Sequence, residues 1–322
     1  MNRNTWIGLL MVAASYGQLL VPKDWAAAHH FAAGGFLSVG VFLFAMGVIF
    51  LGEGVSQQFG GKSLIGLARG NGWNLARFLV VGAATGLLAE IFAQWLGKLW
   101  YYPYYPTWFY WPSLVASFLF YWVMIVESYF GVKAVLDRYI KWGGREKPGP
   151  LRYYGFEHTL YMLLGAAGVG ALVFGLIEIF FSYEARGGGY TFNALGPSFY
   201  APPLRYILLC FAGVWSIGEA VLYTRGLPSL LRSIFHGYVV PALSLAGASV
   251  LTSVIWESQN AQVNYWVYEH WPYPHLSLFH VQLSVLATWP ANYVVYLIIP
   301  AAIVASWAPI IWSRPTRQKA EE

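Results

Sequence analysis

The sequence predicts an all-α integral membrane protein with about eight transmembrane helices and both termini in the cytoplasm. Three observations lead to this prediction. Of the 322 residues, 58% are hydrophobic and only 10% are charged, which is typical of a membrane protein. The apolar residues form eight runs, each a candidate to cross a bilayer, and the basic residues lie mainly in alternate connections between these runs.

A transmembrane helix needs roughly 20 apolar residues, because it rises ~1.5 Å per residue across ~30 Å of hydrocarbon. The eight runs lie at residues 5–21, 31–51, 78–96, 112–136, 160–183, 205–223, 237–257 and 279–312. The first is short and follows Arg3, so a cleaved signal peptide is the alternative to a first span. The last is too long for one straight helix, and Pro290, Pro300 and Pro309 predict kinks or a late surface segment.

The basic residues predict the orientation of these spans. If the N-terminus lies inside, 15 of the 19 Lys and Arg residues fall on the cytoplasmic side. The four that fall outside are Lys23, Lys98, Arg186 and Arg205. Because cytoplasmic connections are enriched in basic residues, this distribution favours eight spans with both termini inside.

The chain is expected to form one membrane domain over residues 1–322. Residues 1–136 carry the first four spans, 137–158 form a basic cytoplasmic loop, 159–312 carry the last four spans, and 313–322 form a cytoplasmic tail. The net charge of +5 does not indicate nucleic acid as a partner, because the basic residues separate apolar runs. We expect a bacterial or archaeal inner membrane and contact with membrane lipids.

Two outer connections are unusually aromatic. One holds Trp100, Tyr101, Tyr102, Tyr104, Tyr105, Trp108, Phe109, Tyr110 and Trp111, and the other holds Tyr265, Trp266, Tyr268, Trp271 and Tyr273. Trp and Tyr favour the headgroup level, so these tracts are interpreted as an interfacial belt. The alternatives are a lid over a hydrophobic ligand and a docking surface for a protein partner.

The sequence around Glu90, followed by Trp100, resembles the sequence around Glu257, followed by Trp266, and a weaker copy surrounds Glu178. In each copy a helix that runs outward carries one glutamate near its outer end. The pattern predicts helical hairpins repeated in parallel, with a period near eighty residues. Parallel repeats favour a shared central cavity.

Five glutamates fall within the predicted spans: Glu90, Glu127, Glu178, Glu219 and Glu257. Ionisable side chains cost roughly 2.5 to 3.5 kcal/mol at the centre of a membrane helix, so we expect them to point away from lipid. Each acid either hydrogen-bonds a neighbouring helix or belongs to a functional site. The functional alternatives are general acid catalysis, proton coupling and cation binding.

Glu90 and Glu257 are the predicted catalytic residues, because each has amide side chains nearby and an aromatic outer tract. The predicted ligand-binding residues are Gln94, Glu127, Glu178, Glu219, Asn260, Gln262, Trp100, Trp266 and Tyr268. We expect no cofactor, because the sequence holds no phosphate loop or dinucleotide fingerprint. We expect no metal either, because the spacing of the histidines matches no standard ligand motif.

Trp256 and Glu257, followed by Asn260, Trp266 and Tyr268, resemble the lycopene-cyclase-domain family of membrane carotenoid enzymes. The segment from Glu90 to Tyr101 is similar, so the resemblance covers about a third of the chain. It implies a membrane fold that handles isoprenoid-like substrates through carboxyl acid chemistry. The family's Pro-x-Glu-Glu element is absent, since the corresponding segments begin Pro-Ser-Leu at 112 and Pro-Pro-Leu at 202.

Three functions remain open at this point. The first is binding or acid-catalysed conversion of a hydrophobic isoprenoid or lipid ligand by the intramembrane glutamates. The second is a proton- or cation-coupled transporter, and the third is a non-catalytic membrane assembly subunit. Glutamates that converge on a closed, lipid-accessible cavity would favour the first, an aqueous path the second, and scattered acids bonded to neighbouring helices the third.

Overall fold

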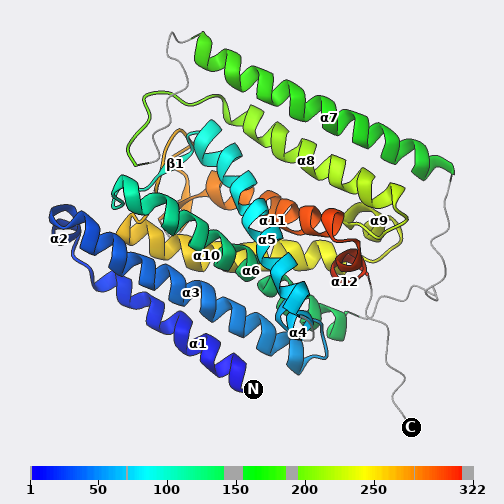
Figure 1. Cartoon of the computed structure of the whole chain (residues 1–322), viewed down its shortest axis with the longest axis horizontal. Coiled ribbons are helices and arrows are strands. Elements are labelled where there is room, and N and C mark those ends of the chain that lie inside the picture. Colours follow the sequence, from blue (N-terminus) through cyan, green and yellow to red (C-terminus); the bar gives the residue numbers. More distant parts are fainter. Residues whose placement is uncertain (1, 70–71, 141–154, 186–194, 279, 314–322) are drawn as a thin grey trace.

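The computed structural model is a bundle of long helices with short helices and strands at its two ends (Figure 1). It describes residues 2–69, 72–140, 155–185, 195–278 and 280–313. Within these residues, seven helices are long and apolar enough to cross a membrane. The all-α membrane class is therefore as predicted. Most of the predicted basic loop at 137–158 and nearly all of the tail at 313–322 lie outside the described residues.

The first half of the chain contains three of these seven helices. They are α3 (His30–Gln58), α5 (Gly72–Glu90), extended by the π-helical segment η2 (Ile91–Leu96), and α6 (Thr107–Tyr139). Before them come α1 (Arg3–Ser15), the 3₁₀ segment η1 (Tyr16–Leu20) and the short α2 (Lys23–Ala28). The short α4 (Leu64–Ala68) connects α3 to α5.

The second half contains the other four, which are α7 (Gly155–Glu184), α8 (Leu204–Thr224), α10 (Val240–Val263) and α11 (Leu283–Ile303). Short segments complete it: α9 (Leu230–Phe235), η3 (Ala305–Trp307) and α12 (Ala308–Trp312). Pro290 and Pro300 lie inside α11 without ending it, whereas Pro309 lies in the first turn of α12. The segment after α11 was one candidate for a surface segment, but Ile311 and Trp312 of α12 are buried within the protein.

The first predicted span differs most from expectation. Residues 5–21 fold as α1 followed by the tighter η1, so no single regular helix of full spanning length forms there. The segment still packs along α3, where a Cβ atom placed on Gly8 or Gly47 would meet backbone atoms of the other helix at 2.5 to 2.9 Å. Glycine is therefore required at this close approach.

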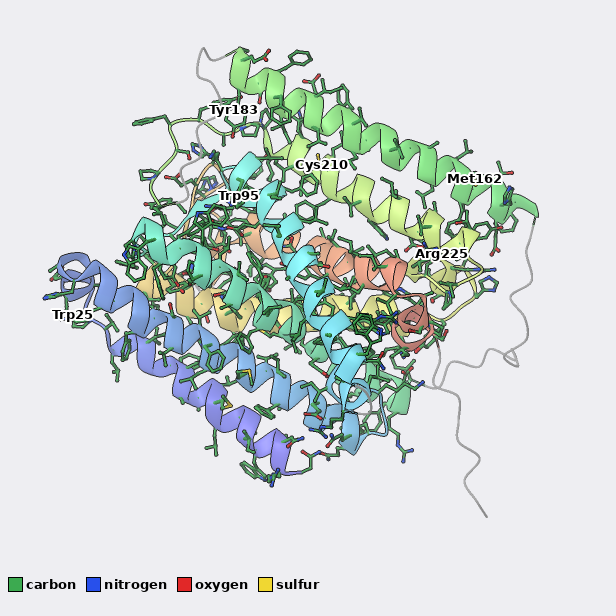
Figure 2. The ribbon with its side chains drawn as sticks, viewed as in Figure 1. Trp25, Trp95, Met162, Tyr183, Cys210 and Arg225 are labelled. Atoms are coloured by element: carbon green, nitrogen blue, oxygen red, sulfur yellow. The ribbon has the colours of Figure 1, made fainter. Side chains whose placement is uncertain are left out.

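At the opposite edge of the bundle, α7 packs mainly on α8 (Figure 1). Gly168 and Gly175 lie at this seam, and Cys210 lies beside it on α8 (Figure 2). The outward side of α7 carries exposed apolar side chains such as Met162 and Phe174. Such a face is expected of a helix at the lipid boundary.

The two ends of the bundle differ in composition. The N-terminus, α4, α9 and α12 lie at one end, called here the basic end (Figure 1). At the other end, called here the aromatic end, β1 (Trp100–Tyr101) pairs antiparallel with β2 (Val267–Tyr268). A second short pair, β3 (Ser277–Leu278) and β4 (Val281–Gln282), follows β2 in the chain. The candidate site is built around β1 and β2.

Candidate functional site

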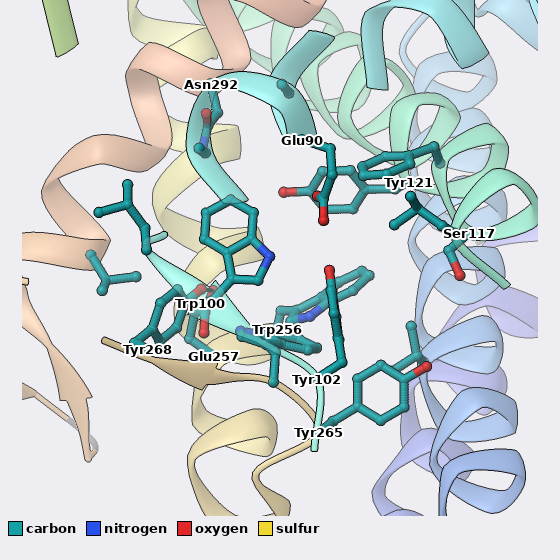
Figure 3. Close-up of a pocket in the computed structure, with 18 of the residues that line it drawn as sticks. Glu90, Trp100, Tyr102, Ser117, Tyr121, Trp256, Glu257, Tyr265, Tyr268 and Asn292 are labelled. Carbon is teal, nitrogen blue, oxygen red and sulfur yellow. Dashed lines mark hydrogen bonds between the residues drawn. The ribbon is translucent and has the colours of Figure 1, made fainter. Parts of the chain in front are cut away.

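A cavity of about 400 Å³ lies between the helices and is bounded by β1 and β2 (Figure 3). Its walls come from α3, α5, α6, α8, α10 and α11. The aromatic residues that line it include Trp100, Tyr102, Tyr110, Tyr121, Trp256, Tyr265, Trp266, Tyr268, Trp289 and Tyr296. A volume of this size and an apolar wall with a few polar groups are typical of a small-molecule site.

Glu257 projects from α10 into this cavity and is only 1% exposed. Its Oε1 atom accepts hydrogen bonds from the Tyr268 hydroxyl at 2.5 Å and from the Trp289 Nε1 at 3.2 Å. Its Oε2 atom has no hydrogen-bond partner among the described residues. One carboxyl oxygen is therefore fixed by two donors, and the other is buried without a hydrogen bond among the described residues.

Glu90 reaches the same cavity from the last residue of α5 and is also 1% exposed. Its Oε1 atom lies 3.4 Å from the Tyr110 hydroxyl, which also lies 3.1 Å from Gln94 Oε1. A tyrosine has one hydroxyl proton, so Tyr110 donates to only one of these two oxygens at a time. Tyr102 lines the cavity close to Glu90, and its hydroxyl points toward the carboxyl (Figure 3).

The π-helical segment η2 begins directly after Glu90. Such wide turns within α-helices occur frequently at functional sites. Here η2 carries Gln94, which is buried and contacts Tyr110, and the chain then reaches Lys98 in the left-handed region at φ 51°. This irregular path delivers Trp100 to the cavity from the strand β1.

The β1–β2 pair joins the two aromatic tracts. Trp100 is paired with Tyr268, and their ring centroids are 6.2 Å apart. Asn260 holds the turn before β2, because its amide group donates to the carbonyl of Trp266 and accepts from its N–H, both at 3.0 Å. Asn260 thus positions Trp266 but does not itself line the cavity.

Ser38 of α3 ties both aromatic tracts to the bundle. Its Oγ atom is 2.8 Å from the Tyr105 hydroxyl and 3.0 Å from the Tyr265 hydroxyl. All three side chains line the cavity. The two tracts therefore close the aromatic end of the cavity, and they are more than an interfacial belt.

Burial raises the pKa of two tyrosines that lie outside the membrane-spanning helices. Burial, with a further contribution from the Glu90 charge, raises the pKa of Tyr102 well above 10. Burial and the Glu257 charge do the same for the pKa of Tyr268. Both hydroxyls therefore keep their protons at neutral pH and remain hydrogen-bond donors.

The other predicted site residues lie elsewhere. Among the described residues that line the cavity, Glu90, Glu257, Trp100, Trp266 and Tyr268 were predicted, and Gln94 and Asn260 lie immediately behind them. Glu127, Glu178, Glu219 and Gln262, which were also predicted to bind a ligand, do not line the cavity. Gln262 is exposed, and Glu178 lies on the peripheral helix α7.

Glu127 and Glu219 instead accept hydrogen bonds from backbone N–H groups at the N-termini of two short helices. Glu127 Oε1 accepts the Ile65 N–H at 2.8 Å, at the N-terminus of α4. Glu219 Oε1 accepts the Leu231 N–H at 3.2 Å, at the N-terminus of α9. The first N–H groups of a helix have no partner within it, so both acids have a structural use.

Among the lining residues, Tyr110 was predicted only as a member of the outer aromatic tract, and Tyr121, Trp289 and Tyr296 were missed from the sequence. A signal for them exists in helical spacing. On α6, Tyr110, Ser117 and Tyr121 recur at intervals of seven and four, and on α11 Trp289 and Tyr296 are seven apart. Such intervals place side chains on one helix face.

A further similarity between the halves was also missed. Residues 47–64 align with 213–230 without a gap, and both segments read Gly-Val-x3-Gly-Glu-x-Val-x4-Gly-x2-Ser-Leu. Both end a long helix on a glycine with positive φ, +70° at Gly60 and +69° at Gly226. Both then start a short helix at a serine, Ser63 or Ser229, whose side chain accepts a backbone N–H.

No family model, curated protein or solved structure matches this chain. A functional assignment therefore depends on the geometry of the cavity.

Proposed function

We propose that the protein crosses the membrane eight times, with α1 and η1 together as the first crossing and the basic end in the cytoplasm. Figure 1 supports this proposal, because the N-terminus, α4, α9 and α12 lie at one end of the bundle. Arg3, Arg69, Arg225 and Arg232 belong to segments at that end, as positive residues on the cytoplasmic side would.

Cysteine labelling in intact cells tests this topology. With Cys210 replaced by serine, single cysteines are placed at Ser277 and at Gln58. A membrane-impermeant maleimide should label the first site and reach the second only after the cells are opened. Labelling of both sites from the outside would contradict the eight-span proposal.

We also infer that the chain consists of two similar halves, each with four membrane crossings. The aligned segments 47–64 and 213–230 support it, as does the antiparallel β1–β2 pair, which is locally two-fold symmetric. In such a repeat Glu90 and Glu257 are counterparts, because each lies on the long helix that follows the aligned segment. Glu178 lies on α7, which does not follow an aligned segment, so it is not a counterpart of Glu90 or Glu257. The proposed repeat unit is therefore longer than the hairpin of about eighty residues expected from the sequence.

For function, we propose that the cavity binds a hydrophobic ligand of the isoprenoid or lipid class and that Glu90 and Glu257 act on it. One observation carries this proposal, namely the meeting of two buried carboxyl groups in one aromatic cavity. Burying carboxyl groups is unfavourable, and the described structure gives one oxygen of Glu257 no partner. A ligand group that meets this oxygen would compensate for the burial.

Acid chemistry on an alkene is consistent with this arrangement. A carboxylic acid in the cavity gives its proton to one alkene carbon, and the π electron pair forms the new C–H bond. The positive charge left on the other carbon faces the rings of residues such as Trp100 and Trp256. Loss of a different proton from the ligand to the carboxylate forms a new alkene and restores the acid, so no oxidant or reductant is needed.

Mass spectrometry of lipids that co-purify with the gently extracted protein tests the proposal. Wild-type protein should retain a hydrophobic compound at a stoichiometry near one, and Glu90→Gln and Glu257→Gln should lower that retention while folding survives. Glu178→Gln is the matched control, since this acid lies in a helix away from the cavity. If both cavity variants keep the wild-type ligand content, these acids have no role in ligand binding.

The two alternatives have less support. Transporters often bind their substrates at helices interrupted near the middle of the membrane, but α11 continues through Pro290 and Pro300, and Pro241 lies in the first turn of α10. The structural role fits Glu127 and Glu219, which bond short helices. It does not explain the cavity that Glu90 and Glu257 share.

A further inference from the structure

The charges around the cavity are unbalanced. Glu90 and Glu257 both line it, whereas none of the described residues that line it is Lys, Arg or His. A carboxylate taken out of water requires either a proton or a positive partner. The described residues that line the cavity include no positive side chain, and Lys98 lies just before the lining residue Leu99 in the chain, so an ionised carboxyl group there would gain its positive partner from a ligand.

Glu257 shows where such a partner would bind. Two donors, from Tyr268 and Trp289, converge on Oε1, and Oε2 is left without a partner among the described residues. Two hydrogen bonds to one oxygen stabilise negative charge on the carboxylate. Because Glu257 lines the cavity, a cation bound there would lie beside this negative charge.

The aromatic walls suit an organic cation better than a metal ion. Trp100, Tyr121, Trp256 and Trp289 all present rings at the cavity, and the centroids of Tyr121 and Trp256 are only 5.4 Å apart. The faces of such rings attract ammonium groups, and several together form the cages that bind quaternary ammonium ligands. Ca²⁺ and Mg²⁺ instead require six or more oxygen ligands, which include water.

We propose that the ligand is an organic cation, an amine or quaternary ammonium group on an apolar body, with its charge between the Glu257 carboxylate and the surrounding aromatic rings. This inference rests on the proposed hydrophobic-ligand function and names the chemical class of that ligand. Proton transfer to an alkene would leave the same pair of charges in the cavity, a carboxylate facing a cation. The apolar remainder of the cavity holds the body of the ligand.

Three probes of equal chain length test the charge directly. Hexyltrimethylammonium is the cation, 2,2-dimethyloctane is its uncharged carbon isostere, and hexyl sulfate is an anion. Binding is measured by equilibrium dialysis with purified full-length protein in maltoside micelles, corrected for micelles without protein. We expect the cation to bind at least about tenfold more tightly than its isostere, because a charge-assisted contact is lost in the isostere.

Proton linkage provides a second measurement. Hexyltrimethylammonium keeps its charge at every pH, so any change in its affinity reflects the protein. Because the cation favours an ionised carboxyl group, its binding should release a proton and its affinity should rise between about pH 5 and pH 8. The affinity of the uncharged isostere should stay constant over this range.

Variants assign the effect to the cavity. Glu257→Gln should weaken cation binding about tenfold or more and leave binding of the isostere within about twofold. Glu90→Gln is the second variant, in case the first does not fold, and Glu178→Gln is the matched control that should match wild type. Folding is checked by a single symmetric peak in size-exclusion chromatography.

The outcomes separate the inference from the function on which it rests. Equal affinity for the cation and its isostere, or tighter binding of hexyl sulfate, overturns the cation inference and leaves a hydrophobic-ligand site. A cation affinity unchanged by both Gln variants also overturns it. If neither the cation nor the isostere binds, the proposed function fails together with the inference.

Discussion

At the basic end, each half of the chain forms the same turn from a long helix into a short one. The arginine that follows this turn is exposed in the first half and buried in the second. In the first half, α3 ends at a left-handed glycine, Gly60, and Ser63 begins α4. In the second half, α8 ends at Gly226 and Ser229 begins α9. Up to this point the two segments share their spacing, their turn residues and their helix caps.

The arginines that follow differ in burial. Arg69 pairs with Glu53 at 2.8 Å, but its side chain is 58% exposed. Arg232 lies 3.9 Å from Glu157, both side chains are 1% exposed, and its guanidinium lies over the Tyr223 ring. The local sequence therefore determines the turn and the cap, whereas packing of α7 around α9 determines the dielectric environment of the charge. The same type of ion pair should then have very different effects on stability.

The largest expected effect is at Arg232. Replacing it with methionine leaves the buried Glu157 with His236, 3.0 Å away, as its remaining partner, so Arg232→Met should lower the free energy of unfolding by about 3 kcal/mol. Arg69→Met is the matched control in the first half. The Arg69 guanidinium is exposed although Glu53 is buried, so loss of this pair should cost less, about 1 kcal/mol.

Chemical unfolding of both variants in the same micelles, followed by tryptophan fluorescence, measures the difference. A loss of similar size in the two variants would show that the environments are alike, and the comparison of the halves would then fail. Glu157→Gln combined with Arg232→Met sharpens the test, because it removes the buried carboxylate that faced Arg232 and should recover part of the loss.

Much of this fold could be predicted from the sequence. Seven of the eight expected spans are long apolar helices, since hydropathy over roughly 20 residues reports the bilayer itself. Helix ends and irregular turns were not predicted. The 3₁₀ segment at Tyr16–Leu20 and the π-helical segment after Glu90 depend on tertiary contacts, which a single-sequence pattern does not contain.

The site was predictable in part for a physical reason. Glu90 and Glu257 were singled out because aromatic tracts follow them, and these tracts form the strand pair that bounds the cavity. Glu127 and Glu219 look the same in sequence, as acids in apolar runs. Only the fold brings the starts of α4 and α9 to them, so the sequence left open which acids bond a neighbouring helix and which line a site.

A smaller effect is expected where each half packs its first two long segments. A Cβ atom at Gly47 would meet the Val12 nitrogen of α1 at 2.7 Å, and one at Gly213 would meet the Gly168 carbonyl oxygen of α7 at 2.8 Å. Both contacts are with backbone, so the helices have to separate. Gly47→Ala and Gly213→Ala should each destabilise by about 1 to 3 kcal/mol.

Gly170 provides the matched control for this prediction, because it lies within α7 and a methyl group placed on it would have no atom within 4 Å. Gly170→Ala should stabilise by about 0.5 to 1 kcal/mol through helix propensity. Thermal unfolding of the three variants gives the comparison. If only one of Gly47→Ala and Gly213→Ala is destabilising, the two halves do not share this packing and the four-crossing repeat loses support.

The smallest expected effect is a pH dependence of stability that comes from one of the two aromatic outer connections. The connection between α5 and α6 holds Lys98, next to the cavity-lining Leu99, whereas the connection between α10 and α11 has no lysine. Burial lowers the pKa of Lys98 from 10.5 to about 8 in the folded protein. Above about pH 8 the folded state therefore binds fewer protons than the unfolded state, and stability should increase with pH, by about 1 kcal/mol between pH 8 and pH 9. Lys98→Met should remove this increase while keeping the backbone penalty of a side chain at φ 51°. Parallel stability curves for the two proteins over this pH range would show that Lys98 is not desolvated, and the first connection would then be as open to water as an ordinary surface loop.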